Sequence, residues 1–109
     1  MNHFQHNCLR TVPGYLSTNE VLAMGALGLC GEAGETAELI KKAMYQRHYL
    51  SVTELAEELG DVMWYVAVTA WAAGLDLERI MELNEQKRKR RYPVGFTAER
   101  SKNREVQNA

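Results

Sequence analysis

The sequence carries one short acidic pattern twice, and this repeat constrains the fold more than any other feature. The first copy is Glu32-Ala-Gly-Glu35 and the second is Glu58-Leu-Gly-Asp61. Residues three apart lie on the same face of a helix, so each copy presents two carboxylates side by side. Two such helices packed antiparallel would gather four acids at one place, where a bound cation would relieve their repulsion. The repeat therefore predicts a helical hairpin built around a divalent metal site.

Glycines recur every third residue in the helix that carries the first copy, at Gly25, Gly28, Gly31 and Gly34. Each costs about 1 kcal/mol relative to alanine in a helix interior, so the helix itself gains nothing from them. Stripping one flank of side chains lets either a neighbouring helix or a ligand approach the backbone. The sequence leaves both uses open, and the two are compatible.

Apolar spacing and capping residues predict an all-α chain of four helices. Ser17 or Thr18 would cap the second helix, Ser51 and Glu54 form a capping box for the third, and Asp76 would cap the fourth. The expected helices cover residues 2–12, 18–47, 51–74 and 76–92. The fold class is therefore a helical bundle with paired carboxylate-bearing helices.

The apolar pattern indicates which faces are buried. In the second helix an apolar stripe runs beside the edge that bears Glu32 and Glu35, and its members are Leu22, Ala26, Leu29, Ala33, Thr36 and Ile40. The third helix is apolar on every side from Val62 to Ala73, which a chain of 109 residues cannot cover alone. We therefore expect a homodimer or homotetramer that completes the bundle. Part of an apolar set would lie at the subunit interface, namely Trp64, Tyr65, Val68 and Trp71.

Composition narrows the class of protein. The chain is 46% hydrophobic and 25% charged, as is ordinary for a soluble globular protein. Its longest apolar run is shorter than the roughly 20 residues of a membrane span, so no membrane partner is expected. The two cysteines lack CxxC spacing, and the chain starts without the layout of a signal peptide, which favours a cytoplasmic protein with free thiols.

Neither end of the chain is predicted to carry a metal or catalytic site. His3 and His6 are three residues apart, but no third ligand lies near them in the sequence, and a leading helix is expected to fray. We expect both histidines to be exposed to solvent. Residues 97–109 are polar and lack an apolar period, which predicts a flexible tail after a single helical domain of residues 1–96.

The basic run from Lys87 to Arg91 raises two alternative functions. A nucleic-acid-binding module would use such a run, but the chain is acidic overall and the run is scattered around its helix, which disfavours a nucleic-acid partner. A non-enzymatic helical oligomer would explain the aromatic residues but not two glycine-flanked acid pairs. A carboxylate-bridged di-iron bundle requires Glu-x-x-His, and no histidine here stands three residues after a glutamate.

Several motifs together resemble those of a known family. They are Gly28-Leu-Cys-Gly31-Glu32-Ala-Gly34-Glu35, Glu57-Glu58-Leu-Gly60-Asp61-Val-Met-Trp64-Tyr65, and Asn84 with Lys87 and Arg91-Tyr92-Pro93. From about residue 4 to residue 96 the chain resembles the MazG-like, all-alpha nucleoside triphosphate pyrophosphohydrolases. The resemblance implies a helical dimer or tetramer that hydrolyses nucleoside triphosphates to the monophosphate and pyrophosphate. It also implies magnesium ligands at Glu32, Glu35, Glu58 and Asp61, and nucleotide or phosphate contacts at Asn84, Lys87, Arg91 and Tyr92.

The chemistry of the residues agrees with this resemblance. Ligands that are all oxygen suit magnesium, or manganese as a substitute, better than zinc. Such a metal acidifies a water for attack on phosphorus, and a nearby carboxylate, Glu35 or Glu38, would take the proton. Lys87 and Arg91 would stabilise charge on the phosphate chain. The sequence thus predicts a magnesium-dependent hydrolase that acts on nucleoside triphosphates.

Overall fold

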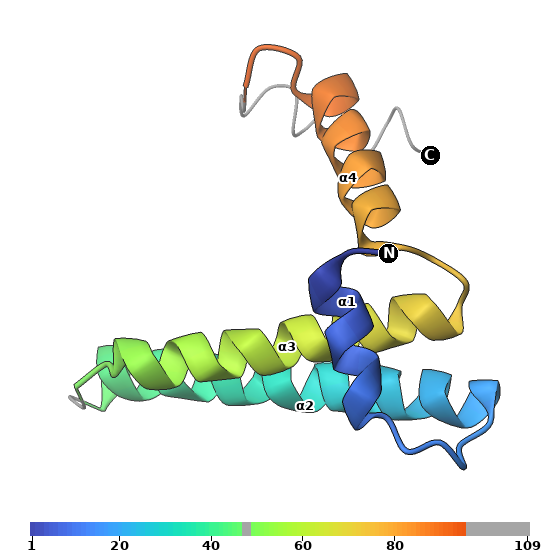
Figure 1. The fold of residues 1–109 in the computed structure, drawn as a ribbon. Coiled ribbons are helices and arrows are strands. Elements are labelled where there is room, and N and C mark those ends of the chain that lie inside the picture. The colour runs from blue at the N-terminus through green and yellow to red at the C-terminus, as the bar shows by residue number, and fades with distance from the viewer. Residues whose placement is uncertain (47–48, 96–109) are drawn as a thin grey trace. The chain divides into compact units, whose positions relative to one another are not determined.

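The computed structural model describes residues 1–46 and 49–95, and within these ranges the chain is helical and contains no β-strand (Figure 1). The prediction of an all-α fold is confirmed. The elements are α1 (His3–Cys8), the 3-10 turn η1 (Leu9–Thr11), α2 (Thr18–Tyr45), α3 (Val52–Ala72) and α4 (Leu77–Arg91). The expected end of the second helix at Arg47 and the expected tail at residues 97–109 lie outside the described residues.

The chain divides after Leu77 into two compact units, each described by itself. In the first unit α2 and α3 lie side by side as an antiparallel hairpin, and α1 lies across it (Figure 1). The second unit holds α4 from Glu78 onward. Within the described residues no helix combines the length and apolar character of a membrane span.

Local sequence signals set the starts of the two long helices. Ser17 accepts a hydrogen bond from the Glu20 backbone N–H, and the Glu20 carboxylate accepts one from the Ser17 N–H, which completes a capping box at the start of α2. Ser51 caps α3 by accepting from the Glu54 N–H, which is one of the two bonds of the capping box expected there. Gly74 ends α3 with φ +77°, a left-handed conformation that glycine adopts without strain.

The core of the first unit lies where α1 crosses the hairpin. Its buried members are Cys8, Val21, Ala67 and Val68, and Val12, Leu16, Met24, Trp64, Ala72 and Leu77 pack against them. Val68 is 0% exposed, so this member of the set from which interface residues were expected belongs to the core of the unit. Trp71, by contrast, is 44% exposed and remains available to a partner.

The leading helix is anchored rather than frayed, because Gln5 is fully buried beneath it. Its Nε2 donates to the backbone carbonyls of Ala67 and Leu75 at 3.1 and 3.0 Å, and its Oε1 accepts from the Leu77 N–H at 3.0 Å. One amide side chain thus ties α1 to α3 and to the turn after it through three hydrogen bonds to the backbone. His3 and His6 are exposed, as expected.

The buried face of α2 overlaps the expected apolar stripe only in part. Four members of the stripe are half-buried, namely Leu22, Leu29, Thr36 and Ile40, whereas Ala26 and Ala33 are exposed. The fully buried residues of α2 are Val21 and Gly25, which lie outside the stripe. The contact therefore includes the flank that carries Gly25 and Gly28, where α3 packs against positions that lack side chains.

Candidate metal centre

Close packing of glycines brings the two acid-bearing helices together. A Cβ placed on Gly25 would overlap the Thr69 side chain, and one placed on Gly28 would overlap the ring of Tyr65. The antiparallel register set by these contacts continues along the hairpin to Glu32, which therefore faces the acids of α3. Gly31 and Gly34 meet no described atom within 4 Å, so helix packing does not explain them.

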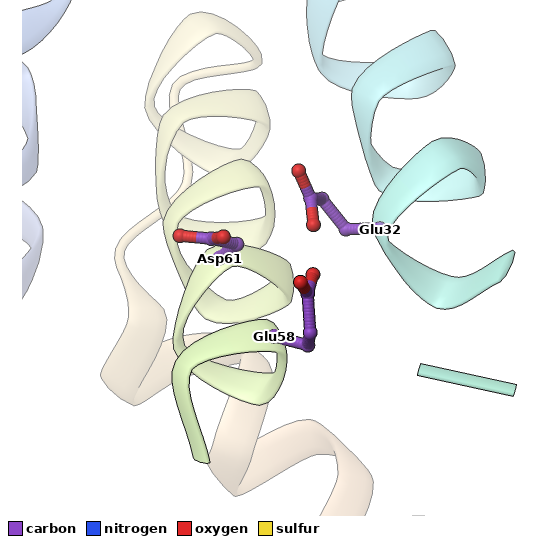
Figure 2. A group of neighbouring side chains, drawn as sticks. All are labelled: Glu32, Glu58 and Asp61. Atoms are coloured by element: carbon purple, nitrogen blue, oxygen red, sulfur yellow. The ribbon is translucent and has the colours of Figure 1, made fainter. Parts of the chain in front are cut away.

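Three of the predicted ligands converge. Glu32 on α2 and Glu58 and Asp61 on α3 each offer a carboxylate oxygen, and these oxygens all lie within 4.8 Å of one another. Figure 2 shows Glu32 and Glu58 reaching toward each other from facing helices, with Asp61 beside them. Glu32 and Glu58 are half-buried, whereas Asp61 is exposed. Three of the four acids expected at the site thus converge, Glu35 is not in this group, and the ligand role of all four remains a prediction.

Glu58 has an unusual proton affinity for a carboxyl group. Hydrogen bonds to Glu32 and Glu35, available only when one carboxyl is protonated, raise the pKa of Glu58 to about 7. Desolvation and the charges of the same two neighbours act in the same direction. Glu35 therefore joins the cluster through Glu58, although its own side chain is exposed.

The donor atoms of this cluster suit a cation. One oxygen of Glu32 and one of Glu58 are buried, and neither accepts a hydrogen bond from the described part of the chain. Buried carboxylate oxygens without a donor are costly unless a proton or a metal ion compensates them. All donors are carboxylate oxygens, which suits magnesium or manganese. The residues present therefore fit a hard divalent ion.

Glu38 lies one turn further along α2 and is exposed. Its carboxylate pairs with the Lys41 ammonium at 3.7 Å, a surface contact between neighbouring turns of the helix. The predicted alternative between Glu35 and Glu38 as the catalytic base is not decided by contacts alone. Glu35, however, is the one that interacts with a member of the cluster.

Two aromatic rings lie beside the acids, and both belong to the set from which subunit-interface residues were expected. Trp64 and Tyr65 are half-buried, and together with Glu32 and Asp61 they line an open cleft of about 320 Å³. Their spacing from Asp61 could have predicted this position, because residues three and four after an acid lie on the same face of a helix as that acid.

The predicted phosphate ligands belong to the second unit. Asn84 accepts a hydrogen bond from Arg88 Nε at 2.8 Å, which holds that guanidinium along α4. Tyr92 lines a hollow of about 500 Å³ on α4, together with Glu85, Arg88, Lys89 and Gly95. Arg88 and Lys89, which were not among the predicted phosphate ligands, thus line this hollow with Tyr92. The roles expected of Asn84, Lys87, Arg91 and Tyr92 remain predictions.

Comparisons with known proteins identify relatives of this chain. The family model of the MazG nucleotide pyrophosphohydrolase domain matches residues 22–96. The Gene 37 protein of Mycobacterium phage L5 is 38% identical over 80 residues, which cover 70% of each chain. No solved structure gives a significant match. The matched residues contain every predicted site residue, whereas α1 and η1 precede them.

Proposed function

Because the chain belongs to the MazG nucleotide pyrophosphohydrolase family, we propose that it hydrolyses a nucleoside triphosphate to the monophosphate and pyrophosphate. Magnesium is the proposed cofactor, with manganese able to replace it. The observation that carries this proposal is the convergence of Glu32, Glu58 and Asp61 within 4.8 Å, with two buried oxygens that no described donor satisfies.

The proposed ligands of the cation are Glu32, Glu35, Glu58 and Asp61. When bound, a divalent ion supplies Lewis-acid stabilisation for the phosphate oxygens and lowers the pKa of the attacking water. Glu35 is the proposed base that accepts the proton of this water, because it is exposed and interacts with Glu58. Glu38 is the second candidate, and its carboxylate pairs with Lys41 rather than with a member of the cluster.

Residues of α4 would contribute to binding of the same substrate. We propose that Lys87 and Arg91 stabilise the negative charge of the phosphate chain, and that Asn84 and Tyr92 contact the nucleotide. Water would cleave the bond between the α and β phosphates, so that pyrophosphate leaves and the monophosphate keeps its sugar and base.

The experiment that tests the proposal is an assay of pyrophosphate release over a panel of ordinary and modified triphosphates. We expect release from at least one of them with magnesium, retention of activity with manganese, and loss of activity in chelator. Orthophosphate as the primary product, or activity that survives chelation, would contradict the proposal.

We also propose a cytoplasmic homodimer or homotetramer. Cys8 and Cys30 are free thiols, which suits a reducing compartment. Several large apolar side chains of the hairpin are exposed, including Leu27 at 75% and Met63 at 54%, and a second copy would cover them. Light scattering should give a multiple of the 12.4 kDa chain mass, and a folded monomer at micromolar concentration would refute the assembly.

A further inference from the structure

The cleft beside the acid cluster has two chemically different sides. Glu32 and Asp61 supply carboxylates, whereas Trp64 and Tyr65 supply flat apolar surface. A nucleoside triphosphate has the same division, because its phosphates need a cation and its base offers a planar face for stacking. The orientation of the two rings therefore bears on how a base would fit, provided that the proposed function holds.

The ring of Trp64 is held on two sides. It meets the ring of Tyr65 edge to face, with centroids 4.9 Å apart and planes at 85°. Its Nε1–H donates to the hydroxyl of Thr11 at 2.8 Å. An indole has a single polar group and two side-chain torsions, so these two contacts fix the plane and the direction of the ring.

Thr11 is itself held in one orientation. Its hydroxyl donates to the backbone carbonyl of Cys8 at 2.9 Å, so its hydrogen is engaged and its lone pairs face the indole. Cys8 is a member of the buried core, and Gln5 ties the same helix to α3 through the Ala67 carbonyl. A hydrogen-bonded chain thus runs from the anchored N-terminal segment to the wall of the cleft.

We propose that Thr11 is a positioning residue for the nucleotide site, whose hydroxyl orients Trp64 so that the Trp64–Tyr65 pair receives the base of the triphosphate. Thr11 precedes the residues that match the family model, so the N-terminal segment would add to the family's site a support of this chain's own. The rings act on binding, whereas the carboxylates carry the chemistry. Loss of the support should accordingly raise KM and leave kcat nearly unchanged.

The test compares Thr11→Val, which keeps the shape and removes the hydroxyl, with Thr11→Ser, which keeps the hydroxyl. For the triphosphate that the parent hydrolyses best, Thr11→Val should raise KM by about three- to tenfold, as expected for loss of one hydrogen bond. Its kcat should change by less than about twofold. Thr11→Ser should behave as the parent does.

A spectroscopic measurement reports the hydrogen bond without any activity. The chain has two tryptophans, so its ¹H–¹⁵N spectrum contains two indole N–H signals. The Trp64 proton should shift upfield in Thr11→Val and stay in place in Thr11→Ser, with the Trp71 signal as an internal control. The α,β-imido analogue of the best triphosphate, added with magnesium, should shift the Trp64 signal of the parent.

A double-mutant cycle tests the coupling between Thr11 and Trp64 even if a single variant perturbs folding. Trp64→Phe keeps a ring and lacks the N–H, so Thr11→Val should add nothing to its KM if the two residues act as one unit. An unchanged KM in Thr11→Val, an unmoved Trp64 signal, or additive effects in the cycle would each overturn the inference. Failure of the proposed function can be distinguished from failure of this inference, because the parent protein itself would then release no pyrophosphate.

Discussion

The carboxyl groups of Glu32 and Glu58 face each other from α2 and α3, and each has one buried oxygen that no donor in the described residues reaches. Two like charges held at this distance repel each other, and each loses part of its hydration. The Glu32–Glu58 pair is therefore stabilised either by a proton shared between the two carboxyl groups or by a bound cation. Both alternatives lead to measurable consequences.

Replacing Glu58 by glutamine separates the proposed role of this carboxyl as a metal ligand from its repulsion of the neighbouring acids. Glu58→Gln should abolish pyrophosphate release and raise the melting temperature in chelator, because the amide donates a hydrogen bond to the neighbouring acids and removes a charge. Magnesium should raise the melting temperature of the parent more than that of the variant, since it binds the folded parent more tightly. Thermal unfolding with and without magnesium measures both effects.

The matched control is Glu57→Gln, which makes the same change of charge on an exposed neighbour in the same helix. It should leave activity intact and alter the free energy of unfolding by no more than about 0.5 kcal/mol. If Glu58→Gln retains activity, or if magnesium stabilises both proteins equally, Glu58 is not a metal ligand.

The raised pKa of Glu58 predicts how stability depends on pH in the absence of metal. The pKa is about 7 in the folded protein against an ordinary value of 4.5, so between these pH values the folded chain holds a proton that the unfolded chain releases. Stability from this group is fully present below about pH 4.5 and is lost as pH rises through about 7. Denaturant unfolding in chelator at pH 5 and pH 7.5 should show the parent losing more stability than Glu58→Gln.

The variant serves as the control here because every other titrating group is common to both proteins. Equal pH dependence in the two would mean that Glu58 ionises normally in the folded state.

The same substitution, glycine to alanine, should lower the free energy of unfolding at Gly25 and raise it at Gly31. A Cβ on Gly25 would overlap Thr69 Oγ1 and lie 3.1 Å from Thr69 Cβ, so Gly25→Ala must push α2 and α3 apart at a cost of roughly 1–3 kcal/mol. A Cβ on Gly31 meets no described atom within 4 Å, so Gly31→Ala should stabilise α2 by up to about 1 kcal/mol. Urea unfolding of the two variants measures the difference. If the two variants change the free energy of unfolding equally, α2 and α3 do not pack through Gly25.

Gln5 should stabilise the fold although it lies near the chain terminus. Gln5→Met preserves an unbranched side chain of similar size but removes the bonds to the carbonyls of Ala67 and Leu75 and to the N–H of Leu77. The bond to Ala67 is buried and the other two are partly buried, so the expected loss of stability is about 1–3 kcal/mol. The exposed Gln46→Met provides the control, and equal urea midpoints for the two variants would refute the anchoring role.

Local features of the fold followed from the sequence because their causes are local. The cap at Ser17, the stop at Gly74 and the spacing of Glu58 and Asp61 each depend on residues within one helical turn. The repeat of the acidic pattern on two long helices was enough to predict that Glu32 would meet the acids of α3. A helical period and a short connection leave few other arrangements.

Three features were decided only by tertiary structure: the face of α2 that packs, the burial of Gln5 and the orientation of Trp64. The apolar stripe through Leu22 and Ala26 gave only part of the buried face, because a hydrophobic pattern is read from large side chains and the closest contacts with α3 are made at Gly25 and Gly28. The bonds from Gln5 to Ala67 and from Trp64 to Thr11 join residues more than fifty positions apart. Such contacts have no period in the sequence, because they form only after the hairpin and the leading helix have packed together.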